Sequence, residues 1–216
     1  MSMIRGSSLS CYPELVRELG GDPDQLLRTA GIRARDAADY GVQLPVRAVL
    51  RAVESAAAAT ATPDFGRRLA RRQSLEIIGP VGAAARTAAT VADALTVIST
   101  FISAYSPALA VGVVPLDNRD RLFLKCELLL DRVPHCPQSI ELCLGVSLGV
   151  LRFLLGENYN PISVHLPHDP LTPAGDYVDY FGCRGYFAER TTGLTLRAGD
   201  LRRRMHPDHV AHRALV

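Results

Sequence analysis

The spacing of apolar residues changes once along this chain, at Pro107, and this change constrains the fold more than any other feature. Before the proline, apolar residues recur three and four positions apart, and glycine or proline ends each run. After it, residues 108–114 and 122–130 are rich in β-forming residues and flank a turn-forming stretch at 117–120. The sequence therefore predicts a helical first half and a second half that contains a sheet.

Helix start and stop signals divide the first half. Asp22 stands as an N-cap before Pro23, and proline is favoured at the first position of a helix. Thr90 precedes Asp93 by three residues, which resembles a capping box. We expect helices to begin near residues 12, 22, 45, 63, 79 and 90, and the last of them to be closed by Pro107.

The second half alternates strands and helices. A long apolar helix is expected over residues 139–155, ending at Gly156, and it follows the hairpin. Further along we expect a strand at 162–166, a short helix at 176–181, and strands at 186–188 and 194–196. This order predicts a mainly antiparallel sheet with the long helix packed on one face, which is an α+β fold. The predicted parts are a helical subdomain at 1–106, an α+β subdomain at 107–201 and a linker at 202–216.

Charge and cysteine content narrow the classes of function. A formal net charge of +2 gives no reason to expect nucleic acid or an anionic membrane as a partner. The arginines at 67, 68, 71 and 72 are interrupted by core positions of an amphipathic helix, so we expect a solvated face there. The best candidate for a membrane span, the uncharged run 142–151, is too short to cross a bilayer. Five scattered cysteines without an export signal indicate the reducing cytoplasm.

A hydrolase motif occurs in the long apolar segment. Gly145, Ser147 and Gly149 match the G-x-S-x-G pattern, and Asp176 and His206 follow in the order of a catalytic triad. The nucleophile elbow requires a strand and a strained turn before the serine, whereas this serine lies inside an expected helix. We therefore interpret the two glycines as a shallow stripe against which another element packs, and we expect no enzyme.

Metal-binding patterns are incomplete. His165 and His168 lie three apart on an expected strand, so their side chains point to opposite faces. Cys136 and Cys143 are two helical turns apart, too far to chelate one ion without help. The three histidines of the last eleven residues supply two ligands at most. The sequence thus predicts neither a metal nor another cofactor.

Several short motifs occur along the chain. Each alone marks a turn or the start or end of a helix, but their order and spacing together are specific to one family. The chain carrying them resembles the N-terminal, arabinose-binding-domain-like region of AraC-type transcription regulators, from about Arg5 to Leu201. The motifs are Tyr12-Pro13-Glu14-Leu15, Glu18-Leu19-Gly20-Gly21-Asp22-Pro23, Pro63-Asp64-Phe65-Gly66, Gly79-Pro80 with Arg86, Tyr105-Ser106-Pro107 and Phe181-Gly182-Cys183 with Phe187.

The resemblance implies a cytoplasmic regulator whose N-terminal domain binds a small effector or mediates self-association. In that family a C-terminal domain with two helix-turn-helix units reads DNA. Only fifteen residues follow Leu201 in this sequence, so we expect DNA contact to belong to a segment that this chain lacks. The partners expected are a small effector and a second copy of the chain, with no membrane.

The effector is expected to be small and largely apolar, such as a fatty or aromatic acid, because the available lining offers few polar groups for a sugar. An arginine is expected to meet its carboxylate. Two alternatives stay open, a ligand-free dimerisation module and, less favoured, a serine hydrolase centred on Ser147. The residues predicted to line the site, for each of which plain core packing is the competing interpretation, are Arg86, Phe101, Tyr105, Phe123, Leu144, Leu148, Arg152 and Phe153.

Overall fold

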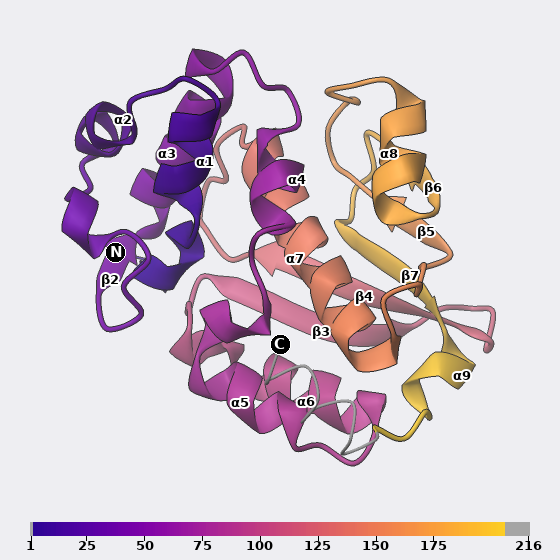
Figure 1. Ribbon diagram of the computed structural model, residues 1–216. Coiled ribbons are helices and arrows are strands. Elements are labelled where there is room, and N and C mark those ends of the chain that lie inside the picture. Colours follow the sequence, from indigo (N-terminus) through magenta and orange to yellow (C-terminus); the bar gives the residue numbers. More distant parts are fainter. Residues whose placement is uncertain (1, 206–216) are drawn as a thin grey trace.

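The computed structural model describes residues 2–205 and has a helical N-terminal half and a C-terminal half built on a mixed sheet (Figure 1). This is the α+β class that the change of spacing at Pro107 predicts. The helices are α1 (Tyr12–Glu18), α2 (Pro23–Ala30), α3 (Val46–Ala59), α4 (Phe65–Ala70), α5 (Pro80–Arg86), α6 (Val91–Phe101), α7 (Pro137–Leu155), α8 (Ala174–Phe181) and α9 (Ala198–Leu201). Short 3-10 turns lie at Gly6–Leu9, Ala34–Asp36, Leu75–Ile78 and Ile102–Ala104.

The caps expected from the sequence hold the helix starts. The Asp22 carboxylate accepts hydrogen bonds from the backbone amides of Asp24 and Gln25 at the start of α2. Thr90 and Asp93 form the complete capping box at the start of α6. These caps satisfy amides that have no partner within the helix, and they act locally, so sequence reasoning finds them.

The main sheet has five strands in the order β3-β4-β7-β5-β6. Its pairs are antiparallel except β5 with β6, which run parallel. In Figure 1, α7 lies across one face of this sheet, between the N-terminal helices and α8. The strands are β3 (Leu109–Pro115), β4 (Arg121–Leu128), β5 (Ser163–His165), β6 (Arg184–Tyr186) and β7 (Gly193–Arg197).

A second, two-stranded sheet near the N-terminus was not expected from the sequence. It pairs β1 (Met3–Arg5) with β2 (Gln43–Pro45) in antiparallel register. The amide of Arg5 also donates to the carbonyl of Tyr105, which ties this ribbon to the end of α6. Strands of three residues carry too little alternation to be recognised from sequence.

The buried apolar residues form two large cores. One joins α1, α2, α3 and α4, and the other joins α5, α6, α7, α8 and the sheet. Helices α5 and α6 therefore share their core with the sheet, although they precede the predicted subdomain boundary at residue 106. Residues 202–205 lie against the start of α6, where Met205 donates its amide to Ala89. The rest of the predicted linker, 206–216, lies outside the described residues.

Helix α7 is held at its start by another helix. The Glu54 carboxylate of α3 accepts hydrogen bonds from the amides of Gln138 and Ser139 and from the Ser139 hydroxyl. By length and a mean hydropathy of 1.5, α7 is apolar enough to cross a membrane, but half of it is buried inside the fold. It is the central helix of this domain.

A buried ion pair joins α4, α7 and α8. Arg67 Nε lies 2.8 Å from Glu141 Oε2, and their side chains are 3% and 0% exposed. Tyr177 donates its hydroxyl to the other carboxylate oxygen, and its ring lies 4.3 Å from the Arg67 guanidinium carbon. Arg67 also donates to Thr172 Oγ1 at 2.6 Å. The prediction that Arg67 belongs to a solvated face is thus wrong, because the Glu141 carboxylate, three helices later in the sequence, compensates its charge.

Removing either member of this pair is expected to lower the free energy of unfolding by about 3–5 kcal/mol, because the other charge stays buried without a partner. Urea denaturation of Arg67→Met and of Glu141→Leu measures the loss. The double variant Arg67→Met/Glu141→Leu is expected to be more stable than either single one. As a control, Arg68→Met breaks an exposed pair with Asp64 and is expected to cost under about 1 kcal/mol. Equal, small losses for all variants would contradict this account.

Candidate functional site

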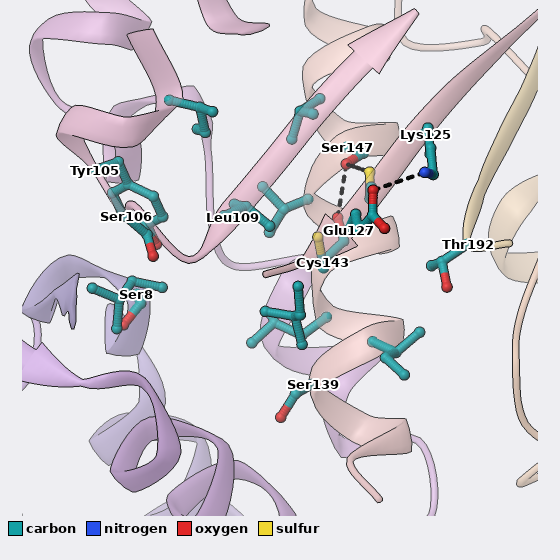
Figure 2. Close-up of a pocket in the computed structure, with 18 of the residues that line it drawn as sticks. Ser8, Tyr105, Ser106, Leu109, Lys125, Glu127, Ser139, Cys143, Ser147 and Thr192 are labelled. Atoms are coloured by element: carbon teal, nitrogen blue, oxygen red, sulfur yellow. Dashed lines mark hydrogen bonds and ion pairs between the residues drawn. The ribbon is translucent and has the colours of Figure 1, made fainter. Parts of the chain in front are cut away.

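A cavity of about 420 Å³ lies between α3, α6, α7 and the strands β3 and β4. Figure 2 shows labelled side chains from β3, β4 and α7 around it, together with Ser8, Tyr105 and Thr192 from neighbouring segments. Its lining is mostly aliphatic, which suits a ligand with little hydrogen-bonding capacity. The aliphatic residues of the wall are Ile4, Val46, Val49, Leu50, Val53, Ile77, Ile78, Leu95, Ile98, Ile102, Leu109, Val111, Leu124, Leu128, Val133, Ile140, Leu142, Val146 and Val150.

Helical spacing on α7 produces one wall of the cavity. Residues spaced three and four positions apart share one face of the helix, and on α7 those that line the cavity are Ile140, Cys143, Val146, Ser147 and Val150. Val146 and Val150 are only half-buried although they lie in the interior of the molecule. The space that exposes them is the cavity itself.

One end of the cavity carries cationic and hydroxyl groups. Lys125 of β4 pairs with Glu127 on the same strand at 2.7 Å, and both line the wall. Arg190, Thr191 and Thr192 come from the loop that leads into β7. Figure 2 shows Lys125, Glu127 and Thr192 on one side of the view, opposite Ser8 and Tyr105. This end can accept the anionic group of a ligand.

The opposite end carries hydroxyl groups. The Ser8 Oγ atom is buried and makes no well-formed hydrogen bond within residues 2–205, although it lies close enough to Tyr105 to affect its pKa. Burial raises the pKa of the Tyr105 hydroxyl, which therefore stays protonated and can donate. A buried hydroxyl without a partner is costly, so a polar group of a ligand would stabilise this end.

Two thiols and a serine line the cavity between β4 and α7. The Ser147 hydroxyl donates to the carbonyl of Cys143 at 2.9 Å and lies 3.5 Å from Cys126 Sγ. Contact with the Cys143 thiol lowers the pKa of Cys126, and the same contact raises the pKa of Cys143. Ser147 lies inside α7, as the sequence predicts for this glycine-flanked serine, and its hydrogen bond goes back along the helix. It lacks the strained turn of a nucleophile elbow.

The histidines of the incomplete metal-binding patterns do not come together in the part of the chain that the structure describes. His165 lies between the rings of Phe123 and Tyr186, and burial lowers its pKa. His168 donates from Nδ1 to the backbone carbonyl of Asp169 at 2.8 Å. Within residues 2–205, no three side chains of histidine, cysteine, aspartate or glutamate gather in a geometry for a metal ion. The three histidines of the tail lie outside the described residues.

Of the residues predicted to contact a ligand, Tyr105 lines the cavity. Phe123 is buried against His165, and Leu144 is fully buried in the second core. Phe101 points away and is 56% exposed. Phe101, Phe123 and Leu144 therefore do not border the cavity, and their predicted role in ligand binding stays untested.

The two predicted arginines also lie away from the cavity. Arg86 pairs with Glu76 at 3.1 Å and stacks on Phe153. Arg152 lines a second, smaller hollow together with Leu148, on the face of α7 that points away from the cavity. The cations that line the cavity are Lys125, the only lysine in the chain, and Arg190. The isolation of Lys125 inside a β-rich apolar run is the sequence signal that could have pointed to it.

An α+β domain with a cavity of this size and lining is typical of a protein that binds a small apolar molecule. The family model described as "Arabinose-binding domain of AraC transcription regulator, N-term" matches residues 20–205. The chain therefore belongs to this family of AraC-type regulators, as its sequence motifs indicated.

Two known proteins resemble this chain, one in sequence and one in fold. The HTH-type transcriptional regulator VirS of Mycobacterium tuberculosis, in two strains, is 32% identical over 193 residues, covering 89% of this chain and 57% of VirS. The crystal structure of the transcriptional regulator CdpR from Pseudomonas aeruginosa matches with a TM-score of 0.60 and 21% identity. That match covers 85% of this chain and 56% of CdpR, and it shows a shared fold. The chain spans little more than half the length of each.

A phenylalanine at position 146 is expected to enter the cavity and to leave the melting temperature (Tm) unchanged or higher, because it fills space without displacing atoms. A phenylalanine at 144, on the packed face of the same helix, is expected to lower Tm by several degrees, because overpacking costs about 1–3 kcal/mol. Thermal unfolding of Val146→Phe and Leu144→Phe compares the two. Equal losses would show that the cavity is filled in solution.

Proposed function

We propose that this domain binds a small, largely apolar carboxylic acid in the cavity and thereby controls DNA binding by a C-terminal domain. The observation that carries the proposal is the 420 Å³ apolar cavity with a lysine at one end. Its volume falls within the range of about 300–1,000 Å³ that ligand sites occupy. A well-packed protein does not keep such a space without use, since interiors pack as densely as organic crystals.

The lining supports an apolar acid over a sugar. A sugar needs a hydrogen-bonding partner for each hydroxyl, whereas most of this wall is aliphatic. A carboxylate placed beside Lys125 would replace Glu127 as its partner. That exchange costs little, because Lys125 and Glu127 are 39% and 49% exposed and such pairs contribute about 0–1 kcal/mol. Arg190 supplies a second positive charge at the same end.

Membership of the family supports a regulatory role. Relatives named as transcriptional regulators cover most of this chain, and about two fifths of each lies outside the match. We propose that this remaining part contacts DNA, that the whole protein acts in the cytoplasm, and that this domain catalyses no reaction. The cavity also favours ligand binding over a ligand-free module, for which a filled core is expected.

We further propose that the domain dimerises through the free edge of its sheet. Strand β3 is an edge strand, and Val114 near its end is 42% exposed, followed by exposed Leu116. An edge strand whose end exposes apolar side chains is a template for pairing with a second copy.

Thermal shift in the presence of dodecanoate tests the ligand proposal. At a ligand concentration of about 100 times Kd, binding stabilises by about 2.7 kcal/mol, which raises Tm by several degrees. Dodecanol is expected to give a smaller shift, because it lacks the charge. Lys125→Met is expected to remove the difference between acid and alcohol, and Arg121→Gln, on the same strand but away from the cavity, to keep it. If no apolar acid raises Tm, the sensing role is wrong.

Sedimentation velocity tests the dimer. We expect the wild-type chain to sediment as a dimer at micromolar concentration. Val114→Lys is expected to give a monomer, because a charged side chain on an edge strand opposes pairing. Val178→Lys, at an equally exposed apolar position on α8, is expected to stay dimeric. A monomeric wild type, or a monomer from both variants, would contradict the proposed interface.

A further inference from the structure

A second hollow of about 170 Å³ lies on the face of α7 opposite the cavity, between α4 and α8 (these helices are neighbours in Figure 1). The glycines of the G-x-S-x-G motif shape it. A Cβ at Gly145 would lie 2.5 Å from both Ala70 Cβ and the Tyr180 hydroxyl, so glycine there lets α4 and α8 approach. One turn on, a Cβ at Gly149 would meet nothing within 4 Å, and the hollow opens above it.

Two arginines line this hollow. Arg152 donates from Nε to the carbonyl of Tyr159 at 3.1 Å and from Nη2 to Asn160 Oδ1 and the Tyr180 carbonyl. All three acceptors are neutral. Arg71 lies with its guanidinium 4.7 Å from the centre of the Tyr180 ring. Burial lowers the pKa of Arg152, and the positive charge of Arg71 adds to that effect.

The other arginines on or beside α4 have carboxylate partners, whereas Arg71 has none among the described residues. Arg67 pairs with Glu141, Arg68 with Asp64 and Arg72 with Glu18. Within residues 2–205, the Arg71 side chain has neither a carboxylate partner nor a hydrogen bond, and its contact is with the Tyr180 ring. The positive charge in the hollow is therefore left without a counter-charge from the fold.

A third donor faces the same space. Burial raises the pKa of Tyr180 to about 12, so its hydroxyl is protonated at neutral pH. No hydrogen bond of that hydroxyl is found among the described residues. The negative charge of Glu141 contributes to the raised pKa of Tyr180, but this carboxylate already forms an ion pair with Arg67.

We propose that this hollow is a binding site for a phosphate-sized oxyanion, held between Arg71 and Arg152 above Gly149. Planar guanidinium groups bind the oxygens of phosphate in pairs, and two of them match an anion with more than one negative charge. The site lies on the face of α7 opposite to the cavity of the proposed function, and the two linings share one residue, Gln73. An anion bound here would link α4, α7 and α8 and complete the charge balance of the hollow.

Thermal shift with sodium phosphate, compared with sodium chloride at matched ionic strength, tests the site. We expect phosphate to raise the Tm of the wild type by about 2–4 °C over chloride at saturation. Arg71→Gln is expected to lose this excess and still fold, because the Arg71 side chain is exposed and makes no hydrogen bond. Arg72→Gln, its exposed neighbour with a partner, is the matched control and is expected to keep the full excess. General salt effects would act on all three proteins equally.

Two outcomes of this comparison overturn the proposal, and a third comes from the variant Val146→Phe. One is an equal Tm in phosphate and chloride for the wild type, and the other is an undiminished excess in Arg71→Gln. Val146→Phe, which blocks the cavity, is expected to retain the phosphate effect in full. Loss of the effect in that variant would show that phosphate binds in the cavity instead. A failure of fatty acids to bind leaves this test unaffected.

Discussion

The buried pair of Arg67 and Glu141 fixes the position of α7, and the rest of the domain is arranged around that helix. Taking two charges out of water is expensive, and their attraction offsets the cost only in a fixed geometry with the remaining hydrogen-bonding groups satisfied. Tyr177 and Thr172 supply those groups. Since the pair joins α4, α7 and α8, any rotation of α7 would break it. Together with the Glu54 cap, it sets which face of α7 points to the sheet.

That orientation gives α7 two different faces. The valine-bearing face forms a wall of the apolar cavity, with Lys125 at one end and Ser8 and Tyr105 at the other. The glycine-bearing face packs against α4 and α8 and leaves the arginine-lined hollow. The cavity is lined by α3, which contributes to the N-terminal core, and by strands of the second core. Under the proposed function, a ligand bound there would contact both cores.

Local signals explain how much of the fold the sequence could predict. Caps such as Thr90 with Asp93, and the order of strands and helices after Pro107, depend on neighbours in sequence and agree with the structure. The burial of Arg67 and the capping of α7 by Glu54 depend on residues more than seventy positions away. An apolar site was expected from the sequence, but most of the residues that line the cavity escaped prediction for the same reason. An apolar residue that faces a cavity has the same composition signal as one in a packed core, so Leu144 and Val146 were indistinguishable before the helix was placed.

The central claim is that the cavity binds an apolar acid with its carboxylate at Lys125. A crystal structure of the domain grown with dodecanoate tests it most directly. We expect electron density for an extended chain along the aliphatic wall, with the carboxylate within hydrogen-bonding distance of Lys125 Nζ. Side chains that fill the cavity, or a ligand found only on the surface, would contradict it.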